Sequence, residues 1–219
     1  MKKTAVILFS VFSLILGLSV NASAQEGSWS VGADLYNRYV WRGTDFGNSP
    51  VVQPTVEYSV GGFAIGAWGS YSTSASVGGT EADLYATYST DFGLDVVVTD
   101  YYFPAEPGSE GNYFDYDDAH TFELGLSQSI GDFYLSGNVY LNGDNDIYFE
   151  AGYSFGAVDA FVGAGDNAYT LDGDFNVCNV GISTSKEVKI TDSFSLPVSG
   201  SVILNPDSEQ IFFVVGISL

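Results

Sequence analysis

The sequence is poor in basic residues, cysteine and histidine. Its 219 residues include six Lys and Arg against 27 Asp and Glu, with one Cys and one His. Such an acidic chain repels phosphate backbones, which argues against nucleic-acid binding. One Cys excludes an internal disulfide framework and multi-cysteine metal sites, and one His removes most hydrolase and histidine-based metal designs. We therefore expect no metal centre, no cofactor and no enzymatic activity.

The first 24 residues resemble a secretory signal peptide. Lys2 and Lys3 form a positive end, an apolar run covers 5–20, and Ala22-Ser23-Ala24 supplies small residues for cleavage before Gln25. This division predicts a signal peptide over 1–24 and one domain over 25–219. After Gln25, no apolar run approaches the roughly 20 residues that a membrane-spanning helix requires.

Alternation of apolar and polar residues, which is typical of strands, dominates the rest of the chain. In 52–60 the apolar residues occupy the even positions, and in 63–67 they occupy the odd positions after the Gly61-Gly62 turn. We predict about twelve strands, at 28–41, 51–60, 63–72, 80–90, 94–103, 119–130, 133–142, 147–155, 158–165, 175–187, 194–204 and 209–219. Between Phe175 and Lys186 neither parity is cleanly apolar, so that strand has no predicted orientation.

The connections between these strands alternate between short and long. Most strands have about ten residues, the length that a tilted membrane-spanning strand needs. Short turns, longer loops and an even strand count are typical of outer-membrane proteins. The pattern predicts an all-β fold, a transmembrane antiparallel up-and-down β-barrel, in the outer membrane after signal cleavage. Its expected partners are outer-membrane lipid, small solutes or ions, and the barrel-assembly machinery during biogenesis. The oligomeric state is left open.

Six acidic residues of the predicted strands lie opposite the apolar set. In lipid, a β chain must close on itself to pair its backbone groups, so its outer face is apolar and its inner face takes the polar residues. We expect the carboxylates opposite the apolar set to face the lumen: Glu57, Glu81, Asp83, Glu123, Glu150 and Asp159. A soluble barrel or sandwich would reverse the two faces.

An ordered set of motifs in the first half of the mature chain resembles a known family. It comprises Tyr39-Val40-Trp41-Arg42-Gly43, then Gly66-Ala67-Trp68-Gly69-Ser70, then Glu81-Ala82-Asp83-Leu84-Tyr85. The set is similar to that of the TorF-type porins, conserved hypothetical bacterial proteins with a Tyr-x-x-Arg-Gly signature. The resemblance implies an outer-membrane barrel with a pore, in which Tyr39, Arg42, Gly43, Gly66, Trp68 and Ser70 carry the family motifs. It implies no substrate or catalytic residue.

Arg38 and Arg42 are the only basic residues in the first half of the mature chain. They share a parity with Asp34, which we place in the lumen. We expect Arg38 to pair with Glu57, Glu81 or Asp83, because unpaired charges are costly near a low-dielectric wall. With the other lumen carboxylates, the two arginines are candidates for a charged constriction that filters solutes.

The preferred function is a narrow, cation-preferring channel for passive diffusion of small solutes. Two alternatives stay open: a closed-lumen barrel with a structural or adhesive role, and a secreted soluble β protein that binds carbohydrate. For an enzyme, only His120, beside Asp117 and Asp118, offers an acid–base group, and no hydrolase signature accompanies it.

Overall fold

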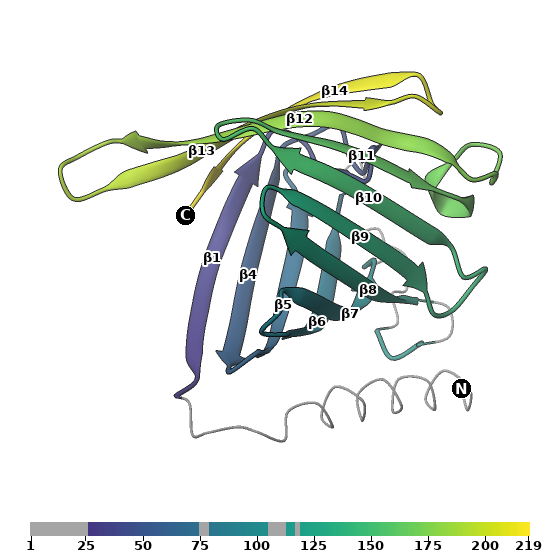
Figure 1. The fold of residues 1–219 in the computed structure, drawn as a ribbon, viewed down its shortest axis with the longest axis horizontal. Helices are drawn as coiled ribbons and strands as arrows, with labels where there is room; N and C mark the ends of the chain where they lie inside the picture. The colour runs from purple at the N-terminus through teal and green to yellow at the C-terminus, as the bar shows by residue number, and fades with distance from the viewer. Residues whose placement is uncertain (1–25, 75–78, 105–112, 117–118) are drawn as a thin grey trace.

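The structure, a computed structural model, describes residues 26–74, 79–104, 113–116 and 119–219. Within this part of the chain, twelve strands form a closed antiparallel barrel, in which strands that follow one another lie side by side (Figure 1). The barrel strands are β1 (Ser28–Tyr36), β4 (Val51–Val60), β5 (Phe63–Ser72), β6 (Glu81–Ser89), β7 (Leu94–Tyr102), β8 (His120–Ile130), β9 (Phe133–Tyr140), β10 (Ile147–Ser154), β11 (Asp159–Gly165), β12 (Asn176–Lys189), β13 (Ser195–Asn205) and β14 (Gln210–Ser218). The predicted barrel and its strand number are confirmed.

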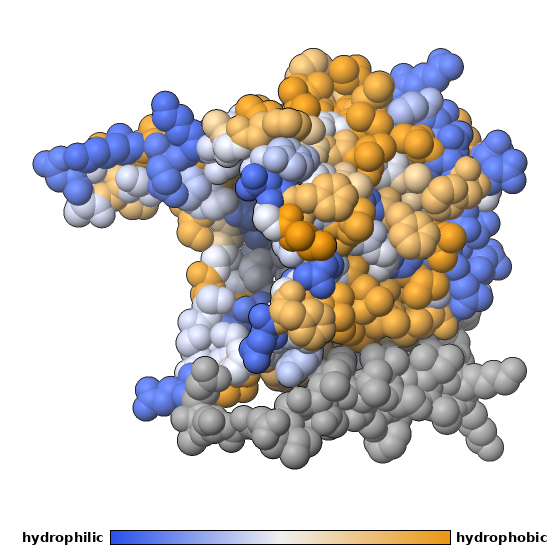
Figure 2. Space-filling model, in the orientation of Figure 1, coloured by the Kyte–Doolittle hydropathy of each residue, from blue (hydrophilic) through white to orange (hydrophobic). Residues whose placement is uncertain are grey.

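Apolar side chains cover the outside of this barrel. Val31, Val56 and Leu126 are exposed, whereas Glu81 and Glu123 are buried inside. On the face shown in Figure 2, hydrophobic residues form a broad band between hydrophilic residues at the tip of the β12–β13 hairpin and at the opposite end. The alternation of period two therefore places apolar residues outward and polar residues inward.

Inward-facing aromatic rings lie over glycines of neighbouring strands. A Cβ on Gly66 would lie 2.3 Å from the Tyr85 hydroxyl oxygen, and a Cβ on Gly152 would lie 2.0 Å from the Tyr134 ring. Each glycine is the direct cross-strand partner of its ring. The same relation joins Phe161 to Gly181 and Tyr36 to Gly216. The high glycine and aromatic content thus reflects rings that need a partner without a side chain.

The barrel closes through a short seam between β1 and β14. Only Asp34–Tyr36 pair with β14, whereas all nine residues of β1 pair with β4. Asn37 lengthens the seam with its side chain, which donates to Phe213 O at 3.0 Å and accepts from Val215 N at 2.8 Å. On the other side of β14, β12 and β13 extend as a long hairpin beyond the rest of the wall (Figure 1).

The predicted strand 28–41 is wrong in its last five residues. The barrel strand ends at Tyr36, and residues 37–50 leave the wall and form a separate two-stranded sheet of β2 (Val40–Trp41) and β3 (Thr44–Asp45). The polar alternation continues past Tyr36 because both segments border the lumen, so the pattern alone does not mark the departure. We call residues 37–50 the inner hairpin.

A β-bulge explains why the strand after Phe175 had no clear parity. The register of β11 and β12 shifts between Gly163 and Ala164, and it leaves Cys178 without a paired residue. Cys178 is buried, and so is the next residue, Asn179. An extra residue of this kind switches the inward parity of a strand from even to odd. No helix in the described part of the chain has the length and apolar character needed to cross a membrane.

Candidate functional site: a hairpin across the barrel lumen

The inner hairpin turns at Arg42 and Gly43. Val40 pairs with Asp45 and Trp41 with Thr44, and the two residues between them have φ angles of 50° and 81°. Two-residue hairpin turns with both φ angles positive favour glycine at the second position. A Cβ on Gly43 would also lie 2.0 Å from the carbonyl oxygen of Cys178. Both conditions restrict this position to glycine.

The hairpin reaches opposite sides of the barrel. On one side, the Tyr39 ring lies 5.5 Å from that of Trp68 on β5, and its hydroxyl is in hydrogen-bond contact with Glu81 on β6. On the other side, the Asn205 side chain on β13 donates to Gly43 O at 3.1 Å. In the ring of strands, β5 and β6 lie across from β12 and β13. The hairpin therefore spans the lumen.

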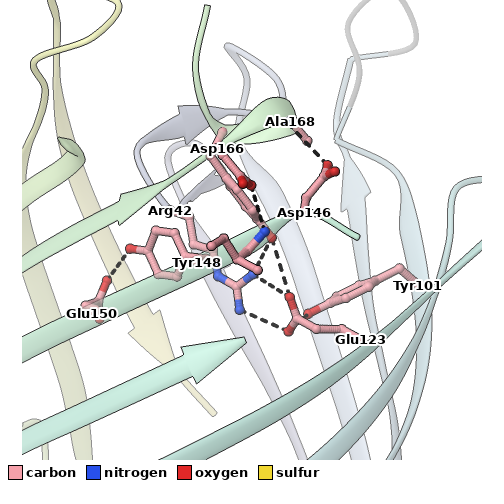
Figure 3. Close-up of polar contacts among 10 residues, drawn as sticks. Arg42, Tyr101, Glu123, Asp146, Tyr148, Glu150, Asp166 and Ala168 are labelled. Carbon is pink, nitrogen blue, oxygen red and sulfur yellow. Dashed lines mark hydrogen bonds and ion pairs between the residues drawn. The ribbon is translucent and has the colours of Figure 1, made fainter. Parts of the chain in front are cut away.

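Arg42 fixes the tip of the inner hairpin to the wall. Its guanidinium donates to both oxygens of Glu123 on β8, at 2.5 and 3.0 Å, and to the Tyr169 hydroxyl at 2.6 Å (Figure 3). The Trp41 and Tyr148 rings lie 4.2 and 4.5 Å from its central carbon. The side chains of Arg42 and Glu123 are only 11% and 3% exposed. Removing one partner of a bidentate ion pair this deeply buried would destabilise the protein, because it leaves the other charge buried without compensation.

Two cavities lie against the inner hairpin. One, of about 470 Å³, is lined by Trp41 and Arg42 together with Tyr134, Glu150 and other inward residues of β9 to β13. The other, of about 400 Å³, is lined by Trp41, Thr44 and Phe46 together with residues of β6 to β9, among them Glu81. Since Trp41 borders both, it stands between them.

Most lumen carboxylates have no basic partner in the described part of the chain. Glu150 accepts from the Tyr134 hydroxyl at 2.6 Å, the Tyr148 hydroxyl at 2.5 Å and the Asn179 amide at 2.9 Å, all of them neutral donors. Glu57 accepts from the Tyr85 hydroxyl at 2.9 Å. Glu123 differs because Arg42 neutralises it. Acidic side chains in the lumen around the hairpin therefore outnumber the basic side chains that could pair with them.

The remaining predicted site residues differ in burial and in their distance from the cavities. Glu81 and Asp83 are buried on β6, near Tyr39 at the start of the inner hairpin, which we call its foot. Asp159, the first residue of β11, is exposed at a short turn and does not line either cavity. Ser70 is fully buried on β5 beside Glu81. Whether these residues act in selectivity stays a prediction.

The expected partners of Arg38 are wrong. Arg38 pairs with Asp45 at 2.9 Å and donates to Asn48 at 2.8 Å, so both partners belong to the inner hairpin. Glu57, Glu81 and Asp83 lie on the wall that the chain has already left at this point. Arg38 therefore stabilises the hairpin itself.

Reasoning from the sequence missed Tyr101 and Tyr169. Tyr101 on β7 donates to Glu123 at 3.0 Å, and Tyr169 lies on the short 3₁₀ helix η1 (Asn167–Tyr169). Asp146 accepts from the backbone N–H of Ala168 at 3.3 Å, which holds η1 over the barrel end (Figure 3). The strands predicted at 158–165 and 175–187 leave this segment as a connection between them. Tyr101 lies on the same face of its strand as the polar residues Thr99 and Asp95, and this shared face could have indicated its inward direction.

His120 ties a connection to the barrel rim. Its Nδ1 lies 2.7 Å from Asp100 and its Nε2 lies 2.6 Å from the carbonyl oxygen of Tyr113. Partial burial, with the nearby Tyr116, raises the pKa of the Tyr113 phenol. With both nitrogens engaged, His120 acts as a tether; its predicted neighbours Asp117 and Asp118 lie outside the described residues.

The fold and the lumen define a twelve-stranded β-barrel with an infolded hairpin. A family model described as a bacterial protein of unknown function (Gcw_chp) matches residues 21–195. The chain belongs to this family. That description does not carry the TorF-type name, so the resemblance to those porins stays a prediction. No curated protein matches the chain.

Among solved structures, the chain is similar to mutants of the Rhodopseudomonas blastica porin. One shares 14% sequence identity with a TM-score of 0.39. A triple mutant of that porin shares 18% identity, also with a TM-score of 0.39. Each match covers 77% of this chain and 55% of the porin chain, so the chain spans just over half the length of the porins it matches.

Proposed function

We propose that the protein is an outer-membrane channel through which small solutes diffuse passively, with a preference for cations. The observation that carries this proposal is the inner hairpin, which crosses the lumen and has a cavity on either side. Carboxylates without a basic partner border these cavities. In this reading, the gap beside Trp41 and Arg42 is the constriction.

The outer surface supports a position in the membrane. A groove of about 670 Å³ on the outside of β8 to β11 is lined mainly by apolar side chains such as Leu126, Leu135 and Phe149. Apolar surface of this extent is unfavourable in water and suits lipid. The longer connections would then face the outside of the cell. Recovery of the mature protein from the periplasm or the medium would overturn this location.

The charge of the lumen supports the preference for cations. Glu57 and Glu150 accept hydrogen bonds only from neutral groups, so no basic side chain offsets either carboxyl group, and Glu150 lines one of the two cavities. A low-dielectric wall strengthens the field of such charges and raises the local concentration of the opposite ion. Arg42 contributes little to the net field because Glu123 offsets it.

Single-channel recording in planar bilayers tests this proposal. Under a salt gradient, the wild-type reversal potential should show cation preference. Glu150→Gln keeps the shape of the side chain and removes its charge, so it should move the reversal potential towards zero. Asp192→Asn, on an exposed turn, is the matched control and should leave it unchanged. Equal selectivity in all three proteins would contradict the proposed filter.

A closed barrel with a structural or adhesive role is the second candidate. The contacts of Arg42 with Glu123, Tyr169 and two aromatic rings favour it, because they hold the inner hairpin firmly across the lumen. The two candidates differ in one measurement. Protein that migrates as a folded barrel in unheated detergent, and yet carries no current, would support the closed barrel.

A further inference from the structure

Four polar side chains form a buried cluster on the inner wall, at the foot of the inner hairpin. Ser70 on β5 and Glu81 on β6 are direct cross-strand partners, and Gln53 on β4 donates to the Ser70 hydroxyl at 3.5 Å. Asp83, two residues after Glu81, faces the same side and pairs with Trp68. All four are at least nine-tenths buried, and Glu81 is only 2% exposed.

The two carboxyl groups of this cluster face each other. They are in hydrogen-bond contact, while Glu81 Oε2 and Asp83 Oδ1 are buried without a partner among the described residues. A carboxylate removed from water needs a compensating charge or hydrogen bonds. Here each carboxyl group keeps an oxygen that nothing in the described chain satisfies.

No basic side chain is placed to compensate them. The chain has four Lys and Arg after the leader. Arg38 pairs with Asp45, Arg42 with Glu123, and Lys189 with Asp192 on a distant turn. Lys186 is exposed near the same turn, on β12. The compensating charge is therefore either a proton that the two carboxyl groups share or a cation from outside the chain.

The donors of the cluster suit a hard cation. They are the carboxylates of Glu81 and Asp83, the hydroxyls of Ser70 and Tyr39, and the amide of Gln53, so all of them can offer oxygen. The described residues hold no group of three or more His, Cys, Asp and Glu side chains arranged for a metal, so an ion at this cluster would have only two carboxylates and otherwise neutral oxygens as ligands. The cluster offers neither thiolate nor imidazole, the ligands that soft transition metals prefer. Calcium accepts mixed carboxylate, neutral oxygen and water ligands in flexible geometry, whereas magnesium demands a near-ideal octahedron.

We propose that Glu81 and Asp83, assisted by Ser70, Gln53 and Tyr39, bind Ca²⁺ on the inner wall of the barrel. The site goes beyond the channel function and does not depend on it. Because Tyr39 belongs to the inner hairpin and contacts Glu81, the bound ion fixes the foot of the hairpin opposite the tip that Arg42 holds. The hairpin is then held at both sides of the lumen.

Terbium luminescence tests the site directly, since Tb³⁺ replaces Ca²⁺ and emits when a nearby tryptophan is excited. Folded barrel in detergent, freed of ions with EDTA, should show saturable emission that Ca²⁺ displaces more readily than Mg²⁺. Glu81→Gln and Asp83→Asn should each weaken Tb³⁺ binding by about tenfold or more, because affinity follows the number of charged ligands. Glu150→Gln, another lumen carboxylate, should bind as the wild type does. Trp68→Phe should lower the emission without changing the affinity.

Two results would overturn the proposal. Unchanged affinity in Glu81→Gln and Asp83→Asn would place the ions on the acidic loops. Absence of saturable binding would mean that the two carboxyl groups share a proton instead. If both variants fail to fold, the unfolding temperature of the wild type in detergent tests the site. Ca²⁺ should raise this temperature above that measured in EDTA. Equal unfolding temperatures in Ca²⁺ and in EDTA would refute the site. None of these readouts needs a current, so failure here is distinct from failure of the channel.

Discussion

Replacement of Arg42 by glutamine should release the inner hairpin from the barrel wall. The variant removes two charge-assisted hydrogen bonds to Glu123, a contact with the Tyr169 hydroxyl and two ring contacts. It also leaves Glu123, whose side chain is 3% exposed, without its counter-charge. The native arrangement around Glu123 then becomes unfavourable.

The size of the effect follows from the burial of the pair. Removing one partner of a buried ion pair costs about 3–5 kcal/mol, which corresponds to a change of roughly 10²- to 4 × 10³-fold in an equilibrium. The inner hairpin is held by a few side-chain contacts, whereas eleven long strand pairings hold the wall. The loss of free energy should therefore release the hairpin and leave the barrel wall folded. We expect the ratio of barrels with the inner hairpin bound to the wall to barrels with it released to fall by most of this factor.

Conductance is the assay, with Cys178 as an independent probe. Arg42→Gln should conduct more than the wild type and prefer cations more strongly, because Glu123 is no longer neutralised. The double variant Arg42→Gln, Glu123→Gln removes both charges and should lie closer to the wild type. Lys189→Gln breaks an exposed pair and serves as the control. Unchanged conductance in folded Arg42→Gln, with Cys178 still protected from thiol reagents, would refute the reasoning.

Three further predictions concern other parts of the structure. Gly43→Ala places a Cβ 2.0 Å from the Cys178 carbonyl at a φ of +81°, so it should displace the hairpin and speed maleimide labelling of Cys178, which is fully buried. His120→Phe keeps a ring but loses the contacts with Asp100 and the Tyr113 carbonyl, so limited proteolysis should cut the chain at 113–116 faster. Leu126→Arg puts a charge on the outer face and should destabilise the barrel by about 2–4 kcal/mol if the site lies at the bilayer midplane, measured by urea unfolding in vesicles. A labelling rate or a proteolysis rate equal to that of the wild type would contradict the contact that the variant removes. A urea midpoint equal to that of the wild type would contradict the outward position of Leu126.

The regular part of the fold was predictable because strand periodicity is local. Alternation in segments such as 52–60 and turn signals such as Gly61-Gly62 depend only on which face each residue presents and where the chain reverses. These signals placed the ends of most strands within one or two residues of those observed. The same parity put Glu123 and Glu150 inside the barrel.

The site was less predictable because it depends on a segment that leaves the sheet. The residues of the Tyr39-to-Gly43 motif were recognised, yet their joint position across the lumen follows from contacts with β5, β8 and β13, which are far apart in the chain. Both residues of the Arg42-Gly43 turn have positive φ angles, and although glycine favours such an angle, arginine gives no indication of one. The bulge at Cys178 and the inward position of Tyr169 likewise depend on register between strands, which one sequence does not encode locally.

The direction of the strand faces is the central claim, and site-directed labelling tests it most directly. In a Cys178→Ser background, single cysteines at Val56 and Glu57 on β4, and at Leu124 and Glu123 on β8, sample the two faces. A fluorophore on the Val56 and Leu124 cysteines should be quenched by lipid-borne quenchers in vesicles, and one on the Glu57 and Glu123 cysteines should not. The reverse pattern would show carboxylates facing the lipid, and the channel account would be contradicted.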